Sequence, residues 1–154
     1  MISKHISDKE GVRSLTAIRL GIDNTPSEEV LVNMKNIAEN IFEPLRNWVG
    51  SPICINSFYR SPSLNKAIGG SSKSQHCKGQ AIDIDDTLGG FSNSIMFNWI
   101  QDNLSYDQII WEFGDENNPD WVHVSFVDKK TNRNRALKAI KEKNKTKYIN
   151  ITNA

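Results

Sequence analysis

Cysteine, histidine and long apolar runs are all scarce in this sequence of 154 residues. Its two cysteines, Cys54 and Cys77, are too few for a disulfide scaffold, and we expect both to be reduced thiols. No apolar run approaches the roughly 18 to 20 residues that span a bilayer, and the first residues lack the apolar region of a secretory signal. We therefore expect a chain that is cytoplasmic as synthesised and has no membrane span.

Composition indicates a folded domain. Hydrophobic residues make up 38% of the chain and charged residues 24%, which excludes the low-hydrophobicity, high-charge composition of disordered proteins. The length suits one domain with a core of its own. We predict a catalytic domain over residues 1–127, followed by a C-terminal tail over 128–154 that belongs to the same domain or extends from its surface.

Charge is unevenly distributed between these two parts. Residues 1–127 contain 10 basic and 16 acidic residues, whereas 128–154 contain 9 basic and 2 acidic residues. The tail is interpreted mainly as a solvated terminal helix, and a second interpretation is attraction to an anionic polymer such as a cell envelope. Nucleic acid is the weaker choice because Tyr148 is the only aromatic residue in the tail.

Helical and strand patterns are segregated along the chain. The predicted helices begin at caps near Ser7, Thr25, Ser61 and Ser92, and the second keeps one apolar stripe as far as Val49. The predicted strands are 53–58, 81–85, 108–113 and 121–126, the last two as an antiparallel pair. This order favours an α+β fold with an antiparallel sheet flanked by helices.

Two of the three histidines lie near carboxylates. His76 is followed by Asp83, which projects from a predicted strand, and His123 lies on another strand. Two imidazoles and a carboxylate are the ligands that a catalytic zinc accepts, with one position left open for water. Bound zinc lowers the pKa of water to roughly 7 and polarises the carbonyl under attack. Cys77 is a poor additional ligand because adjacent residues rarely converge on one ion.

A zinc hydrolase also needs a carboxylate to move protons. Asp120 and Glu112 compete for this role, and Asp120 is favoured because it precedes His123 by only three residues. Strict strand alternation would place Asp120 and His123 on opposite faces, but Pro119 makes an irregular strand entry plausible. Arg60, at the end of a strand, can bind a substrate carboxylate or stabilise a tetrahedral oxygen.

Competing catalytic motifs are missing. The sequence contains no Gly-x-Ser-x-Gly elbow, no Walker phosphate loop and no His-Glu-x-x-His helix. Each candidate residue has an ordinary structural explanation when taken alone. Taken together, the residue types and their spacing favour a metal-dependent hydrolase.

Three segments carry a resemblance to a known family: Ser57-Phe58-Tyr59-Arg60-Ser61, Ser74-x-His76-x-x-Gly79-x-Ala81-x-Asp83, and Asp120-Trp121-Val122-His123-Val124-Ser125. They resemble the zinc D-alanyl-D-alanine carboxypeptidase family, which consists of peptidoglycan peptidases with the Hedgehog/DD-peptidase fold. The resemblance is to the single-domain members of bacteria and their phages. It implies one Zn²⁺ ion bound by His76, Asp83 and His123, Asp120 as catalytic base, and Arg60 and Ser74 as contacts for substrate or transition state.

The sequence therefore predicts a zinc peptidase that cuts an amide bond in peptidoglycan stem peptides or cross-links. It can be a D,D-carboxypeptidase, an endopeptidase, or a phage or prophage lysin that acts on the wall after release. The alternative is a zinc-stabilised, Hedgehog-like binding module without catalysis. We expect peptidoglycan or its precursors as partner rather than nucleic acid.

Overall fold

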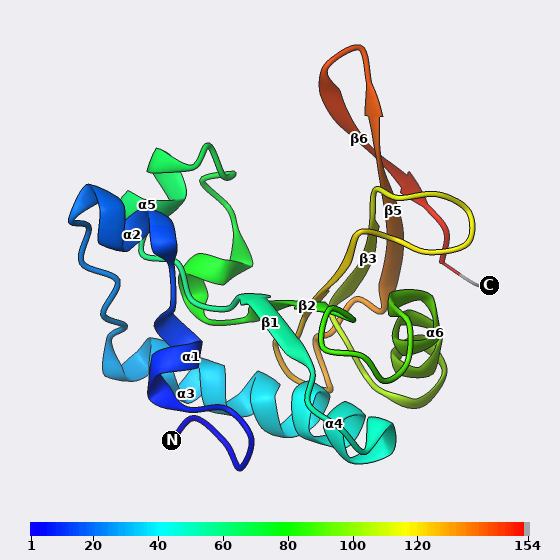
Figure 1. Ribbon diagram of the computed structural model, residues 1–154, viewed down its shortest axis with the longest axis horizontal. Helices are drawn as coiled ribbons and strands as arrows, with labels where there is room; N and C mark the ends of the chain where they lie inside the picture. The colour runs from blue at the N-terminus through cyan, green and yellow to red at the C-terminus, as the bar shows by residue number, and fades with distance from the viewer. Residues whose placement is uncertain (153–154) are drawn as a thin grey trace.

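A computed structural model describes residues 1–152, and one six-stranded sheet lies at its centre (Figure 1). The strand order is β1-β2-β4-β3-β5-β6. The helical elements are α1 (Asp8–Val12), α2 (Leu15–Leu20), α3 (Glu28–Ile37), the π-helix η1 (Ala38–Phe42), α4 (Glu43–Val49), α5 (Pro62–Ala67), the 3₁₀-helix η2 (Gln75–Lys78) and α6 (Asn93–Asn103). The strands are β1 (Cys54–Ser57), β2 (Ala81–Asp85), β3 (Gln108–Glu112), β4 (Trp121–Ser125), β5 (Arg135–Glu142) and β6 (Lys145–Asn150).

Serine side chains begin most of the helices, as the sequence predicts. The hydroxyls of Ser7, Ser61 and Ser92 each accept a hydrogen bond from the backbone N–H three residues later. The start predicted at Thr25 is displaced: α3 begins at Glu28 and Ser27 is its cap. Thr25 lies two residues before this cap, and its hydroxyl donates to Asp23 Oδ1 at 2.6 Å.

The predicted long helix is interrupted by a wider turn. Residues 28–49 are helical throughout, but η1 separates α3 from α4. Pro44, the second residue of α4, has no N–H to donate to the preceding turn. A π-turn accommodates such a missing bond. The apolar stripe still packs inward, since Met34, Ile41 and Leu45 are buried.

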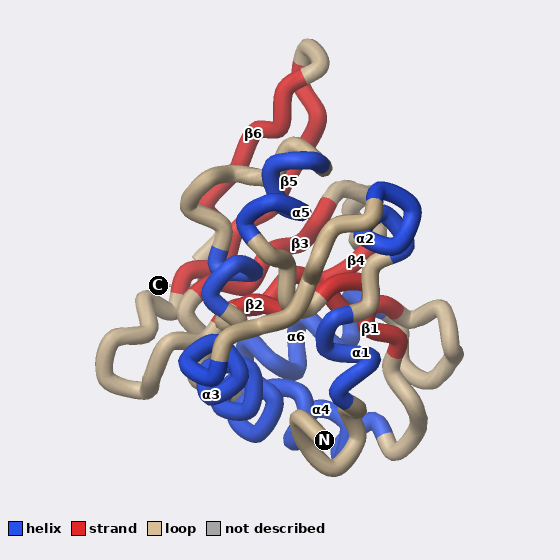
Figure 2. Tube along the Cα trace, turned by 90° about the vertical axis from the view of Figure 1, so that its left-hand side faces the viewer, coloured by secondary structure: helices blue, strands red, loops and turns tan. Residues whose placement is uncertain are grey.

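One face of the sheet packs against helices and the other is open. Ile82 and Ile84 of β2, and Val122 and Val124 of β4, are almost fully buried in the main core. Figure 2 shows α3, α4 and α6 on this side of the sheet. Because side chains alternate along a strand, Asp83 and the residues beside it point to the opposite face.

The C-terminal segment corrects the prediction of a terminal helix. It forms β5 and β6, joined by a two-residue turn in which Lys143 and Asn144 have φ of 51° and 64°. Positive φ at both positions is the type I′ geometry that matches the twist of a hairpin. β5 pairs in parallel with β3, so the sheet is mixed rather than purely antiparallel.

Among residues 1–152, no helix is both long and apolar enough to cross a membrane.

Candidate metal centre

His76 is held in a buried, fixed orientation. It lies in η2 with 1% of its surface exposed, and its Nδ1 is 2.7 Å from the carbonyl oxygen of Phe58. A carbonyl can only accept, so Nδ1 carries the proton and Nε2 has a free lone pair. Ser74 caps η2 by accepting from the His76 N–H at 3.3 Å, and Gly79 ends η2 with φ of 71°.

Asp83 and His123 meet through strand pairing. They are direct partners in the antiparallel register of β2 and β4, and His123 Nδ1 lies 2.9 Å from Asp83 Oδ1. His76 Nε2 approaches the same oxygen at 3.3 Å. The structure thus brings together the three predicted ligands, with one donor atom from each within 4.8 Å of the others.

These three residues fit a metal ion. His76 Nε2 is buried and makes no hydrogen bond within the described residues, although it faces a carboxylate oxygen. In the tautomer with the proton on Nδ1, the Nε2 lone pair is repelled by this anionic oxygen unless a cation lies between them. Burial opposes ionisation of Asp83, but the positive charge and hydrogen bonds that His76 and His123 offer when protonated outweigh it and keep the pKa of Asp83 well below its usual range. The carboxylate is therefore ready to bind a cation at neutral pH.

Glu112 lies on the same, open face of the sheet as this cluster. Its neighbour in register, Trp121, lies on the same face of β4 as His123, and 7% of Glu112 is exposed. Burial raises the pKa of Glu112 to about 7, His123 opposes the rise, and the charge of Asp83 adds to it. A carboxyl group with this pKa can both accept and donate a proton near neutrality.

Asp120 is placed differently from Glu112. It is exposed and lies before β4, which begins at Trp121. Its backbone N–H donates to the Glu112 carbonyl at 2.8 Å, although the register of β3 and β4 sets Glu112 opposite Trp121, and Phe113 has φ of 57°. The entry into β4 is therefore irregular, so strand alternation does not fix the direction of the Asp120 side chain. The base role of Asp120 stays a prediction.

A cleft of about 780 Å³ contains the cluster. Its floor includes His76, Asp83, His123 and Glu112, and Asp120 is not among its lining residues. One wall is the segment from Gly69 to Gln75, and the other is the β5–β6 hairpin. In Figure 1 these two segments rise from the same side of the sheet.

Arg60 also lines the cleft, next to His76. Its backbone N–H donates to the His76 carbonyl at 3.2 Å, which fixes the start of its side chain. Its Nε is buried and has no hydrogen-bond partner among residues 1–152. A buried guanidinium N–H without a partner is available to an incoming anionic or carbonyl oxygen. The predicted residue Ser74 lies in the same wall.

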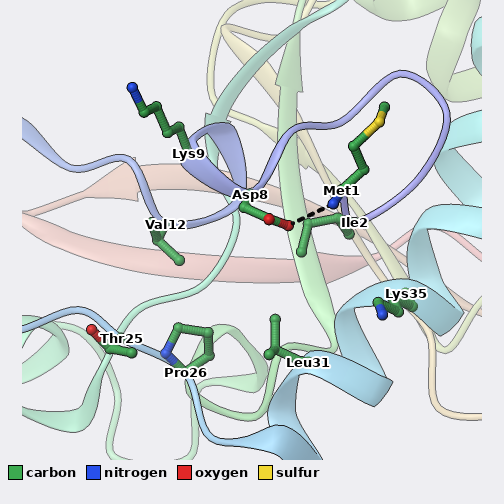
Figure 3. Close-up of a pocket in the computed structure, with 9 residues that line it drawn as sticks. All are labelled: Met1, Ile2, Asp8, Lys9, Val12, Thr25, Pro26, Leu31 and Lys35. Carbon is green, nitrogen blue, oxygen red and sulfur yellow. Dashed lines mark ion pairs between the residues drawn. The ribbon is translucent and has the colours of Figure 1, made fainter.

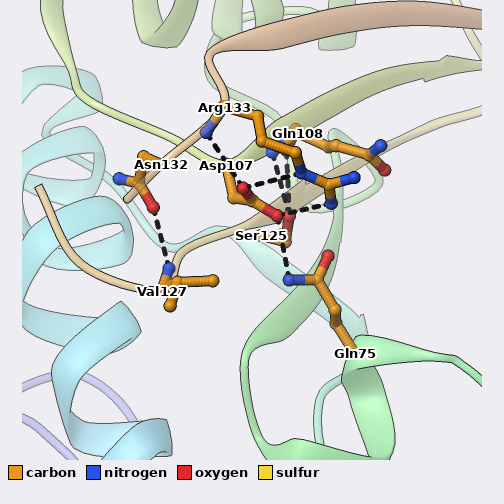
Figure 4. Close-up of polar contacts among 7 residues, drawn as sticks. All are labelled: Gln75, Asp107, Gln108, Ser125, Val127, Asn132 and Arg133. Atoms are coloured by element: carbon orange, nitrogen blue, oxygen red, sulfur yellow. Dashed lines mark hydrogen bonds and ion pairs between the residues drawn. The ribbon is translucent and has the colours of Figure 1, made fainter. Parts of the chain in front are cut away.

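A further buried carboxylate, Asp107, lies next to the site, and sequence analysis did not identify it. Asp107 is 2% exposed and receives Arg133 Nε and Nη2 at 3.0 and 2.7 Å and Gln75 Nε2 at 3.0 Å (Figure 4). Burial opposes its ionisation, but the hydrogen bonds from Arg133 and Gln75 outweigh it and lower the pKa of Asp107. Asp107 therefore links the residue before His76 to the segment that leads into β5.

Another hollow, of about 460 Å³, lies between α1 and the start of α3 (Figure 3). It is lined by apolar residues together with Lys9, Lys35 and Asp8, and Asp8 is paired with the Met1 amino group at 3.1 Å. It contains none of the predicted site residues. The three candidate ligands and Glu112 all lie in the cleft on the sheet.

Comparison with known proteins identifies the family of this chain. No curated protein matches the sequence significantly. A family model described as peptidase M15 matches residues 4–125, which include all three candidate ligands, Glu112, Asp120 and Arg60. The match covers most of the chain but ends before β5. The chain belongs to the peptidase M15 family, that of the zinc D-alanyl-D-alanine carboxypeptidases.

Proposed function

We propose that this protein hydrolyses an amide bond in peptidoglycan stem peptides or cross-links, as a zinc-dependent D,D-carboxypeptidase or endopeptidase, including the role of a phage or prophage lysin. The observation that supports the proposal is the convergence in one cleft of three metal-ligand atoms and the buried carboxyl group of Glu112. An amide hydrolase needs these components side by side.

His76, Asp83 and His123 would hold the zinc ion. When bound, zinc supplies a Lewis acid that polarises the amide carbonyl and favours a water nucleophile at neutral pH. The buried Nδ1 bond to Phe58 keeps His76 in the tautomer that offers Nε2 to the ion. Asp83 contributes the negative charge that a divalent ion requires.

Glu112 is the proposed general base. It takes a proton from the attacking water and passes it to the leaving amine, a transfer for which a pKa near the working pH is best suited. Arg60 is proposed to bind a substrate carboxylate or the oxygen that becomes anionic in the transition state, because its Nε has no partner within the described residues. Ser74 acts mainly by orienting His76.

The test uses purified peptidoglycan and synthetic stem peptides, with products identified by mass spectrometry. We expect hydrolysis that stops on chelation and returns with zinc. Glu112→Gln should lower the turnover by about 10²- to 10⁴-fold, the usual contribution of a general base. Asp120→Asn is the matched control, because it also replaces a carboxylate by an amide, and it should retain activity within a few-fold.

Two outcomes would redirect the proposal. A large loss in Asp120→Asn with little change in Glu112→Gln would assign the base to Asp120, as its spacing from His123 predicts. Zinc binding without any product from peptidoglycan or stem peptides would favour the non-catalytic binding module. Product masses also identify the bond that is cleaved.

A further inference from the structure

The β5–β6 hairpin gives the cleft basic residues that lie outside the family match. The match ends at residue 125, whereas β5 and β6 span 135–150. Arg133, Arg135 and Lys141 from this region line the cleft, and Arg60 and Lys73 line it from the other side. Only two acidic residues, Asp83 and Glu112, oppose these five basic ones in the cleft lining. The cleft is therefore positively charged, although residues 1–127 as a whole carry more acidic than basic residues.

Arg135 and Lys141 differ from Arg133 in having no acidic partner among residues 1–152. Arg133 is paired with Asp107, and within residues 1–152 neither Arg135 nor Lys141 makes an ion pair. Both are exposed, and the Lys141 ammonium lies 5.5 Å from the centre of the Phe113 ring. The two cations are thus free to bind an anionic ligand in the cleft.

Strand register places these two cations on either side of the catalytic floor. On β5, Leu137 pairs with Ile110, which is the partner of His123 in β4, and Ala139 pairs with Glu112. Arg135 precedes these rows and Lys141 follows them on the same face. At about 3.3 Å per strand residue, each lies about 10 Å along the strand from the midpoint of the two rows.

We propose that the β5 wall binds an extended peptide with carboxylates on both sides of the scissile bond, one held by Arg135 and the other by Lys141. The inference rests on the proposed peptidase function and specifies its substrate as a doubly acidic peptide. Between the two cations the cleft is lined by the apolar side chains of Leu137 and Ile110, over which the peptide passes. At the rise of an extended chain, each carboxylate lies about three residues from the cleaved amide.

Binding to the metal-free protein tests this proposal without relying on hydrolysis. The probe is an N-acetylated, C-terminally amidated heptapeptide with glutamate at positions 1 and 7 and alanine between them, together with the two forms in which one glutamate carboxylate is amidated to glutamine. Calorimetry measures affinity for wild type, Arg135→Gln and Lys141→Gln. Lys138→Gln is the control, since it removes the same charge from the opposite face of β5.

We expect each amidation to weaken binding to the wild type by about 3- to 10-fold, in the range of a charge-assisted hydrogen bond at a partly exposed site. Arg135→Gln should abolish the effect of amidating one carboxylate, and Lys141→Gln the effect of amidating the other. Lys138→Gln should leave both effects unchanged.

Three results would overturn the inference. The first is a wild type that does not distinguish the amidated peptides. The second is an equal change in affinity of Arg135→Gln and Lys141→Gln on amidation of either carboxylate. The third is a Lys138→Gln variant that no longer distinguishes the amidated peptides. Either of these two results would indicate general electrostatic attraction. Failure of the peptidase function has a different signature, namely no product from any peptide while the pattern of binding is retained.

Discussion

Replacing Glu112 with glutamine should stabilise the metal-free protein at alkaline pH. The Glu112 carboxyl is buried, and its pKa rises from an ordinary value of 4.5 to about 7 on folding. The folded state therefore holds a proton that the unfolded chain releases between these two pH values. By linkage, the free energy of unfolding falls as pH rises through this window and stays reduced above it.

The structure gives the size of this effect. A tenfold change in proton affinity corresponds to about 1.4 kcal/mol, so a rise from 4.5 to about 7 corresponds to about 3 kcal/mol. Glu112→Gln removes the charge and keeps the shape of the side chain. We expect the variant to be about 3 kcal/mol more stable than wild type at pH 8, and nearly equal to it at pH 4.

Urea unfolding of the metal-free proteins, followed by circular dichroism at half-unit steps between pH 4 and 8, measures the difference directly. The comparison between variant and wild type cancels the titration of groups that do not interact with Glu112. Asp120→Asn is the control, and because Asp120 is exposed its stability difference should be small at every pH. A difference for Glu112→Gln that does not grow with pH would refute the reasoning that burial perturbs this carboxyl group.

Three further predictions concern the supports of the site. Asp107→Asn should lower the free energy of unfolding by about 1.5 to 3 kcal/mol at pH 7, because it removes a charged acceptor from Arg133. The lowered pKa of Asp107 confers stability only above the unfolded value near 4, so urea titrations should show the difference shrinking as pH falls below that value. Gly79→Ala should destabilise the protein by about 1 to 3 kcal/mol in thermal unfolding and weaken zinc binding, because the φ of Gly79 is 71° and a Cβ would lie 2.7 Å from the Val30 carbonyl oxygen. Gly69→Ala is the control, since Gly69 has φ of 77° but open space around it. This variant should destabilise the protein by about 1 kcal/mol and leave the zinc affinity unchanged. Zinc at 100 times its Kd should stabilise the wild type by about 2.7 kcal/mol, and the same zinc concentration should have almost no effect on His123→Ala in the same unfolding assay.

Local signals in the sequence were sufficient for the elements that carry the candidate metal ligands. Strand alternation over 81–85 correctly separates Asp83 from its buried neighbours, and the same rule places His123 on the open face of β4. Serine caps and helical spacing identify most helices because both depend on residues only a few positions apart. Gly79 is explained by its left-handed backbone and its approach to Val30.

The C-terminal strands were misread because their stability depends on distant partners. Residues 135–142 contain alanine, leucine, lysine and glutamate, which are all good helix formers. Pairing of β5 with β3 and β6 overrides that preference by satisfying the backbone of both edges of the strand. The turn at Lys143 and Asn144 lacks the glycine that usually marks a type I′ hairpin, so no local sequence pattern predicted β5 and β6.

The choice between Asp120 and Glu112 shows the same limit at the level of chemistry. Proximity in sequence favours Asp120, whereas Glu112 and not Asp120 lines the cleft. Glu112 reaches the same face as His123 because β3 and β4 pair in a register that sets Ile110 opposite His123. That register depends on the turn and on packing across the sheet rather than on any local pattern. A strand carboxylate can thus share a cleft with the candidate ligands while lying 11 residues before His123 in the chain.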